Sequence, residues 1–293
     1  MRLIVLGSQG NLGHQLVSRA EQAGHQVIGI DRPDLDLTDF VAAYRLVRDG
    51  HYDAVFNAVA WNDVDGAENP ANRPAVWKLN ADLPAVLAAA AAESGSHFVH
   101  YSSDYVFAGD RPSGYEETDR PDPISEYGRS KLAGEQAVLA VGAQGFVCRT
   151  SKLFGPAGPS AAAKPSFVSL MLGLAAQRPE LNIVDEEVGC PTYTADLAEA
   201  SLRLVDGGFA PGIYHLVNSG PGVSWYQFAE ELFGLAEIGV RRRPVPSSAF
   251  PKPAQRPAHA FLKNTKFPSL RPRIEALRQH LMAADGERKK VTQ

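Results

Sequence analysis

Three residues near the middle of the chain carry side chains that could exchange a proton with a carbonyl compound. Tyr127 and Lys131 are four positions apart, so a helix through them would place both on one face. The pKa of a free phenol is about 10, and a nearby ammonium makes the phenolate easier to form. Ser103 follows an apolar run and could hydrogen-bond to a substrate oxygen. These groups suit the proton-transfer half of a reaction in which a hydride carrier supplies the other half.

Taken alone, the spacing of the tyrosine and the lysine has another explanation. A surface lysine often packs its aliphatic stem on a half-buried tyrosine without doing any chemistry. A pair of this kind therefore needs structural context before it indicates a catalytic site.

The N-terminal segment supplies that context. Residues 3–6 form a short apolar run typical of a buried parallel strand, and a Gly-x-x-Gly-x-x-Gly pattern at residues 7–13 follows. A helical pattern then leads to a second apolar run at residues 27–30, which ends at Asp31. This order predicts a βαβ unit that binds a dinucleotide, with the pyrophosphate at the helix N-terminus. A plain glycine-rich turn is the alternative, and the strand, helix and acid around it favour the dinucleotide.

Two adjacent residues bear on the choice of dinucleotide. Asp31 could accept a hydrogen bond from the ribose 2′-hydroxyl of NADH. Arg32 could instead pair with the 2′-phosphate of NADPH. The sequence therefore leaves both NADH and NADPH open as the cofactor.

Strand-like and helix-like segments alternate through the first 150 residues. Further strands are expected at residues 53–60, 97–101 and 145–149, and helices at 39–48, around 77–92 and from about 126. This alternation predicts an α/β fold, a Rossmann-type doubly wound parallel sheet. Ser103 then lies at the carboxyl edge of the sheet, where ligands bind in such folds.

The remainder of the chain has a looser pattern. We expect residues 1–150 to form a dinucleotide-binding domain and residues 151–293 to form mainly a smaller substrate-binding lobe. Helices near 167–177 and 194–205 would pack back on the first domain, and a strand at 213–217 and a helix at 225–235 would follow. Residues 155–165 read as an irregular loop, and prolines make residues 244–257 an extended segment that cannot be helical.

The amino-acid composition of the chain limits the kinds of partner that we expect it to bind. The formal net charge is −4, so the chain lacks the excess of basic residues typical of proteins that bind nucleic acid. No apolar run is long enough to span a bilayer. Basic clusters at residues 241–243 and 288–290 fit a solvated face and a frayed tail. Cys148 and Cys190 have no neighbours at metal-ligand spacing, which favours a reducing compartment. With no signal-peptide pattern, a cytoplasmic location is expected.

The chain resembles the dTDP-4-dehydrorhamnose reductase family of the extended short-chain dehydrogenase/reductases over nearly its whole length. The Asp104-Tyr105-Val106-Phe107 run looks like the reductase version of a segment that is usually more acidic in related dehydratases. The motifs that carry the resemblance lie at residues 7–13, 57–60, 64–68, 101–107, 127–135, 149–151, 189–192 and 256–257.

The resemblance implies roles for particular residues. Tyr127 would protonate the C4 oxygen of the substrate while NADPH or NADH delivers a hydride to C4. Lys131 would hold the nicotinamide ribose and lower the pKa of Tyr127, and Ser103 would orient the keto oxygen. Cofactor-binding residues would be Gly7, Gln9, Gly10, Asn11, Leu12, Gly13, Asp31, Arg32, Asp36, Leu37, Ala58, Val59, Ala60, Tyr127 and Lys131. Substrate-binding residues would be Asp104, Tyr105, Phe107, Lys152 and Arg256.

Two departures from the family pattern affect what we expect. Lys152 stands where the family usually has a tryptophan near the deoxysugar, so we expect another nucleotide-linked 4-keto-6-deoxysugar as substrate. A solvent-exposed loop lysine without substrate contact is the alternative at this position. Gln15 replaces an acid through which some relatives bind Mg²⁺ at a dimer contact, so we expect no metal. A homodimer is an assembly that the resemblance suggests.

Three functions are compatible with these residues. The leading hypothesis is an NAD(P)H-dependent 4-ketoreductase that acts on a nucleotide-linked 4-keto-6-deoxysugar. A nucleotide-sugar epimerase or dehydratase that recycles tightly held NAD⁺ is the second. A non-catalytic, NAD(P)-binding regulatory subunit is the third, because the regulatory subunit of methionine adenosyltransferase resembles the same family.

Overall fold

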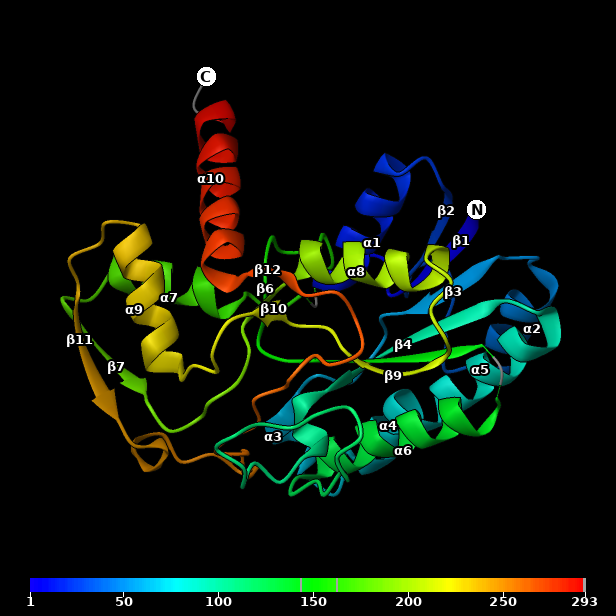
Figure 1. Ribbon diagram of the computed structural model, residues 1–293, viewed down its shortest axis with the longest axis horizontal. Coiled ribbons are helices and arrows are strands. Elements are labelled where there is room, and N and C mark those ends of the chain that lie inside the picture. The colour runs from blue at the N-terminus through cyan, green and yellow to red at the C-terminus, as the bar shows by residue number, and fades with distance from the viewer. Residues whose placement is uncertain (143, 162, 292–293) are drawn as a thin grey trace.

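The centre of the molecule is a six-stranded parallel sheet with the strand order β2-β1-β3-β4-β5-β9 (Figure 1). The computed structural model of the protein describes residues 1–142, 144–161 and 163–291, with side chains up to residue 284. The predicted doubly wound α/β fold is confirmed. Its strands are β1 (Arg2–Leu6), β2 (Gln26–Ile30), β3 (Ala54–Asn57), β4 (His97–Ser103), β5 (Gly145–Thr150) and β9 (Gly212–His215).

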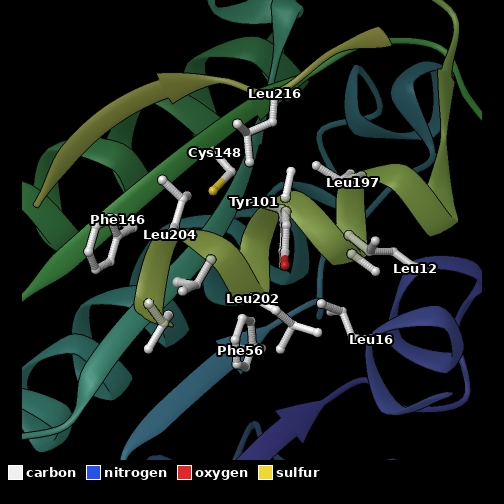
Figure 2. Close-up of a cluster of buried hydrophobic side chains, with 14 of the residues drawn as sticks. Leu12, Leu16, Phe56, Tyr101, Phe146, Cys148, Leu197, Leu202, Leu204 and Leu216 are labelled. Carbon is white, nitrogen blue, oxygen red and sulfur yellow. The ribbon is translucent and has the colours of Figure 1, made fainter. Parts of the chain in front are cut away.

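Helices cover both faces of this sheet. One face packs against α1 (Asn11–Gln22) and α8 (Thr194–Asp206), and Figure 2 shows their leucines meeting strand residues such as Phe56 and Tyr101. The other face packs against α2 (Phe40–Asp49) and α5 (Leu83–Ser94), with Val138 of α6 (Glu126–Ala140) in the same cluster.

Alternate residues of the central strands enter the two cores. In β1, Leu3 and Val5 belong to the cluster under α1 and α8, whereas Ile4 and Leu6 belong to the cluster under α2 and α5. Successive side chains of a strand point to opposite faces, so a strand buried on both sides must be apolar throughout. This explains why residues 3–6 form a continuous apolar run.

Some element bounds differ from those expected. The strand expected at 53–60 ends at Asn57, and residues 58–60 leave the sheet at its carboxyl edge. The helix expected around 77–92 consists of α4 (Arg73–Trp77), a π-helical segment (Lys78–Asp82) and α5, which ends at Gly95 in the left-handed conformation. Residues 244–257 are mainly extended as expected, except for a short 3₁₀ turn (Ser247–Ala249).

A second, smaller core lies beyond the carboxyl edge of the sheet (Figure 1). The parallel pair β7 (Glu180–Val184) and β11 (Arg241–Val245) packs with α7 (Phe167–Ala175) and α9 (Trp225–Leu235). The remaining elements are α3 (Val64–Ala67), a 3₁₀ turn (Asp104–Val106), β6 (Leu153–Phe154), β8 (Thr192–Tyr193), β10 (Asn218–Ser219), β12 (Leu270–Pro272) and α10 (Arg273–Val291).

The two helices that we expected to pack back on the first domain behave differently. α8 packs along α1 against the sheet, whereas α7 packs against α9 and β7. The expectation for α7 was wrong because its apolar side chains, among them Val168 and Met171, enter the core of the smaller lobe. The division of the chain at residue 150 stays a prediction.

The basic clusters and the cysteines can be placed on this fold. The cluster at residues 241–243 lies on β11, where Arg242 pairs with Glu230. The cluster at residues 288–290 lies in the part of α10 whose side chains fall outside the described ones. Cys148 and Cys190 are both buried and unpaired thiols. No helix in the described part of the chain is long and apolar enough to cross a membrane.

Candidate active site

The glycine turn between β1 and α1 forms a cradle that side chains would fill. Gly7 has a φ of +76°, which favours glycine. A Cβ atom on Gly13 would lie 2.0 Å from the Gly7 carbonyl oxygen, so only glycine allows this close approach. Gly10 precedes the first turn of α1, and no described side chain caps that turn. The free N–H groups and the helix dipole therefore fit the pyrophosphate of a dinucleotide.

A loop from the second half of the chain crosses this turn. Asn11 donates a hydrogen bond to the Lys164 carbonyl at 2.9 Å and accepts one from the Gly158 amide at 2.9 Å. The Ser160 amide donates to the Gln9 carbonyl at 3.0 Å. The irregular loop expected at residues 155–165 is therefore anchored at the cofactor end of the cleft.

Asp31 braces the glycine turn from the end of β2. Its carboxylate accepts hydrogen bonds from the Gln9 amide at 2.9 Å and from the Arg32 amide at 2.8 Å. Asp36 lies on the same side and accepts from the Thr38 amide at 2.9 Å, which lowers the pKa of the Asp36 carboxyl. Both acids line the cleft with Arg32, and their contact with the adenosine ribose stays a prediction.

The candidate catalytic residues meet at the carboxyl edge of β4. Tyr127 and Lys131 lie on α6 and are 8% and 2% exposed, so the lysine is not a surface residue. The Lys131 Nζ donates to the Tyr101 carbonyl at 2.5 Å, and burial lowers the pKa of Lys131 to about 8. Ser103 ends β4 and is close enough to hydrogen-bond to Tyr127.

The pKa of Tyr127 depends mainly on burial. Burial raises the pKa of the Tyr127 phenol to about 12, and the hydrogen bond with Ser103 opposes that rise. Lys131 is not among the causes of the shift, because with a pKa of about 8 its amine is neutral at the pH where this phenol would ionise. The pKa of Tyr127 is thus raised overall in this structure, and the effect of Lys131 on it stays a prediction. A raised pKa keeps the phenol protonated, as a proton donor requires.

Three local features place α6 against the catalytic edge. The Ser125 side chain caps the helix by accepting from the Gly128 amide at 3.1 Å. A Cβ atom on Gly128 would lie 2.2 Å from the Tyr105 carbonyl oxygen, so glycine lets the helix approach the turn after β4. Further along, Glu135 forms a buried two-pronged ion pair with Arg149 of β5, at 2.7 and 2.8 Å.

Most of the predicted site residues line one cleft of about 840 Å³. It runs from the glycine turn to the catalytic edge and continues to Lys152 and Trp225. Its predicted members are Gly7, Gly10, Asn11, Leu12, Gly13, Asp31, Arg32, Asp36, Leu37, Ala58, Val59, Ala60, Ser103, Asp104, Tyr105, Tyr127, Lys131 and Lys152.

Comparison with known proteins agrees with this arrangement. The family model described as RmlD substrate binding domain matches residues 1–284. The dTDP-4-dehydrorhamnose reductase of Mycobacterium tuberculosis is 40% identical over 272 residues, which cover 91% of this chain and 86% of that protein. The chain belongs to the dTDP-4-dehydrorhamnose reductase family.

Two further relatives extend the likeness. The spore coat polysaccharide biosynthesis protein SpsK of Bacillus subtilis is 34% identical over 288 residues, or 96% of each chain. The crystal structure of dTDP-4-dehydrorhamnose reductase from Bacillus anthracis in complex with NADP has a TM-score of 0.89 and 32% identity, covering 96% of this chain and 99% of that one.

Three predicted site residues of this family member lie away from the main cleft. Gln9 contributes backbone contacts behind the glycine turn. Phe107 is fully buried and stacks on Tyr115 at 4.2 Å between ring centroids, so it packs in the core. Arg256 pairs with Asp65 at 2.8 Å and lines a second cavity of about 570 Å³.

The reductase cleft also contains residues that sequence reasoning missed. Ser151 donates to the buried carboxylate of Asp104 at 2.5 Å, and Trp225 donates from Nε1 to Glu187 at 2.9 Å. Phe167 packs against Trp225 in a tilted arrangement, at 4.5 Å between ring centroids. Phe167 and Trp225 begin helices far along the chain, and no local pattern signals that they meet the cleft. Ser151 lies in a family motif and could have been singled out.

Burial raises the pKa of the Asp104 carboxyl, although Ser151 and Ser103 both donate to it. Each oxygen of this carboxylate is therefore held by a serine hydroxyl of the protein. Among the described residues, no group of three histidines, cysteines or acids is placed to hold a metal ion. The absence of a metal stays a prediction, as do the individual roles of the site residues.

Proposed function

We propose that this chain reduces the C4 keto group of a nucleotide-linked 4-keto-6-deoxysugar with NADPH or NADH. The observation that carries the proposal is that Tyr127, Ser103 and Lys131 line the same cleft as the glycine turn. The curated reductase relatives and the NADP complex of the Bacillus anthracis protein support the activity and the type of cofactor.

The residues of the chain divide the chemistry among them. The bound dinucleotide supplies the hydride to C4. Tyr127 starts protonated, since the pKa of a phenol lies well above neutral pH and burial raises it further to about 12, and it gives its proton to the C4 oxygen as negative charge develops there. Ser103 donates to Asp104 in the structure, and its single O–H would turn to the same substrate oxygen to hold the carbonyl toward Tyr127. Lys131 lies one helical turn away, where its ammonium can bind the hydroxyls of the nicotinamide ribose.

The second cavity is a suitable place for the nucleotide end of the substrate. It shares Tyr105, Phe167, Glu187 and Trp225 with the main cleft, so the two cavities adjoin. Three basic side chains line this cavity: Arg178, Lys252 and Arg256. Their positive charge would attract the diphosphate of the substrate. The sugar would then lie between this cavity and Tyr127.

The test is to follow NADPH and NADH oxidation with dTDP-4-dehydrorhamnose and related dTDP-4-keto-6-deoxysugars. In the Tyr127→Phe variant, turnover should fall by about 10²-fold or more, because the proton donor is lost. The affinity for NADPH, measured by fluorescence titration, should change little and shows that the variant is folded.

Turnover at the wild-type rate by Tyr127→Phe would contradict its role as proton donor. An epimerase or dehydratase would instead interconvert sugars without net consumption of NADPH. A regulatory subunit would bind NADPH and oxidise it with none of the sugars. Product analysis of the same reactions therefore separates the three functions.

Assembly and location are also part of the proposal. A homodimer stays a prediction that light scattering of the purified protein would test. The two buried free thiols fit a reducing compartment such as the cytoplasm. Fractionation of cells that express the tagged protein would test that location.

A further inference from the structure

Lys152 is held at the sugar end of the cleft by an unusual backbone conformation. Its φ is +47°, a left-handed value that costs a residue with a Cβ atom of order 1 kcal/mol. A Cβ atom on Gly189 would lie 2.7 Å from Lys152 Cε, so a glycine across the cleft makes room for the side chain. A backbone conformation of this kind persists only where the surrounding contacts hold it in place.

The contacts of Lys152 leave part of its ammonium group unused. The Nζ donates to the Glu187 carbonyl at 2.7 Å and lies 3.5 Å from the centroid of the Trp225 ring. An ammonium has three N–H donors; the Glu187 carbonyl accepts one, and the Trp225 ring attracts the cation without accepting a conventional hydrogen bond. Lys152 forms no salt bridge within the described parts of the chain, and it lines the cleft together with Ser103 and Tyr127.

Trp225 and Glu187 hold the lysine in this direction. The indole of Trp225 donates to the Glu187 carboxylate at 2.9 Å and packs at a tilt against Phe167, at 4.5 Å between ring centroids. The face of the Trp225 ring and the Glu187 carbonyl therefore form a rigid binding site, the lysine seat, that fixes the position of the ammonium. A flexible surface lysine would have no such seat, so the alternative of a solvent-exposed loop residue does not describe this site.

The surrounding charge indicates what the free donor would bind. The carboxylates of Asp104 and Glu187 lie near enough to favour the ammonium form of Lys152. Because two acids already balance the cation, the pocket offers a hydrogen-bond donor more than an unmet positive charge. A neutral hydroxyl fits this position because its oxygen can accept from the ammonium without needing a charge of its own.

We propose that Lys152 donates a hydrogen bond to a ring hydroxyl of the sugar and thereby selects 4-keto-6-deoxysugars that retain this hydroxyl. The inference rests on the proposed ketoreductase function and adds the class of sugar that the site accepts. A sugar without the hydroxyl leaves the charged donor unpaired in a site from which it displaces water. Loss of a hydrogen bond to a charged group corresponds to roughly 10- to 100-fold in kcat/KM.

The experiment compares sugars that differ by single hydroxyls. We would measure kcat/KM for NADPH oxidation with dTDP-4-keto-6-deoxyglucose and with its 2-deoxy and 3-deoxy analogues. Wild-type enzyme should discriminate against one of the analogues by about 10- to 100-fold. Lys152→Met keeps the length of the side chain but removes the donor, and it should reduce this ratio to about 3 or less. Exposed Lys266 provides the control variant Lys266→Met, which should retain the wild-type ratio.

Two results would overturn the inference while leaving the ketoreductase function intact. One is a wild-type enzyme that reduces all three sugars with equal efficiency. The other is a Lys152→Met variant that binds NADPH normally and keeps the wild-type ratio. If wild-type enzyme binds NADPH but oxidises it with none of the sugars, the proposed function fails and the inference falls with it.

Discussion

At the scale of single residues, burial controls the chemistry of this site more than local spacing does. Tyr127 and Lys131 are one helical turn apart, yet each has its pKa shifted mainly by removal from water. Burial disfavours the charged form of both groups. It therefore raises the pKa of the Tyr127 phenol and lowers the pKa of the Lys131 ammonium. The phenol therefore remains a protonated donor at neutral pH.

Lys152 predicts a pH dependence of sugar discrimination. Burial lowers the pKa of its ammonium to about 7, and the nearby acids Glu187 and Asp104 oppose that effect. Below that pH the side chain is a charged donor, and above it the neutral amine is a weaker one. The preference of kcat/KM for the hydroxylated sugar should therefore decrease as the pH rises from about 6 to about 8.

The control for this prediction is Lys152→Arg, whose guanidinium stays charged over the whole range. In this variant, the preference of kcat/KM for the hydroxylated sugar should be independent of pH. Cys190 and Lys252 also act on Lys152, and burial raises the pKa of the Cys190 thiol to about 12, outside the range tested. A pH dependence that persists in Lys152→Arg would assign the titration to another group, such as Asp104.

At the scale of elements, α6 delivers the catalytic pair to the edge of β4. The Tyr-x-x-x-Lys spacing predicted that both residues share one face of a helix beginning near residue 126, and α6 confirms this. Sequence reasoning did not predict how closely the helix would approach the turn after β4. That approach depends on Gly128 and on the Glu135–Arg149 ion pair, which join segments far apart in the chain.

The close approach of α6 can be tested by adding one carbon atom. Gly128→Ala would place its Cβ 2.2 Å from the Tyr105 carbonyl oxygen, so the helix and the turn must separate. We expect kcat to fall by about 10-fold or more, because small displacements of catalytic groups are costly.

A matched control is Gly173→Ala in the middle of α7, where nothing lies within 4 Å of the new Cβ. This change should preserve kcat and raise the free energy of unfolding by about 0.5–1 kcal/mol in thermal or urea denaturation. Equal kcat values for Gly128→Ala and the wild-type enzyme would show that the contact does not position Tyr127.

At the scale of the whole molecule, the two cores meet around the cleft, and polar contacts join them. Arg256 donates to both oxygens of Asp65 at 3.0 and 2.8 Å, which ties the extended C-terminal segment to α3. Arg256 was predicted to bind substrate directly. In the structure its guanidinium is held by Asp65 while it lines the second cavity, so it can also shape the wall of that cavity.

This ion pair should affect binding of the nucleotide sugar more than binding of the cofactor. We expect Asp65→Asn to raise KM for the sugar several-fold and to lower the free energy of unfolding by about 1 kcal/mol, since the pair is partly exposed. The Kd for NADPH should not change. The control Asp49→Asn removes an exposed pair on α2 and should leave stability nearly unchanged. Identical KM values in both variants would contradict the role of the Asp65–Arg256 pair.

The sequence by itself determined the doubly wound sheet, the glycine turn, the acid after β2 and the helical Tyr127–Lys131 pair. These features follow from short-range periodicity and from the conformational freedom of glycine, both of which can be read within a few residues. Only the tertiary structure decided the direction of the Tyr127 pKa, the packing of α7 and the seat of Lys152 on Trp225 and Glu187. Those outcomes depend on burial and on contacts between distant segments, which local patterns do not encode.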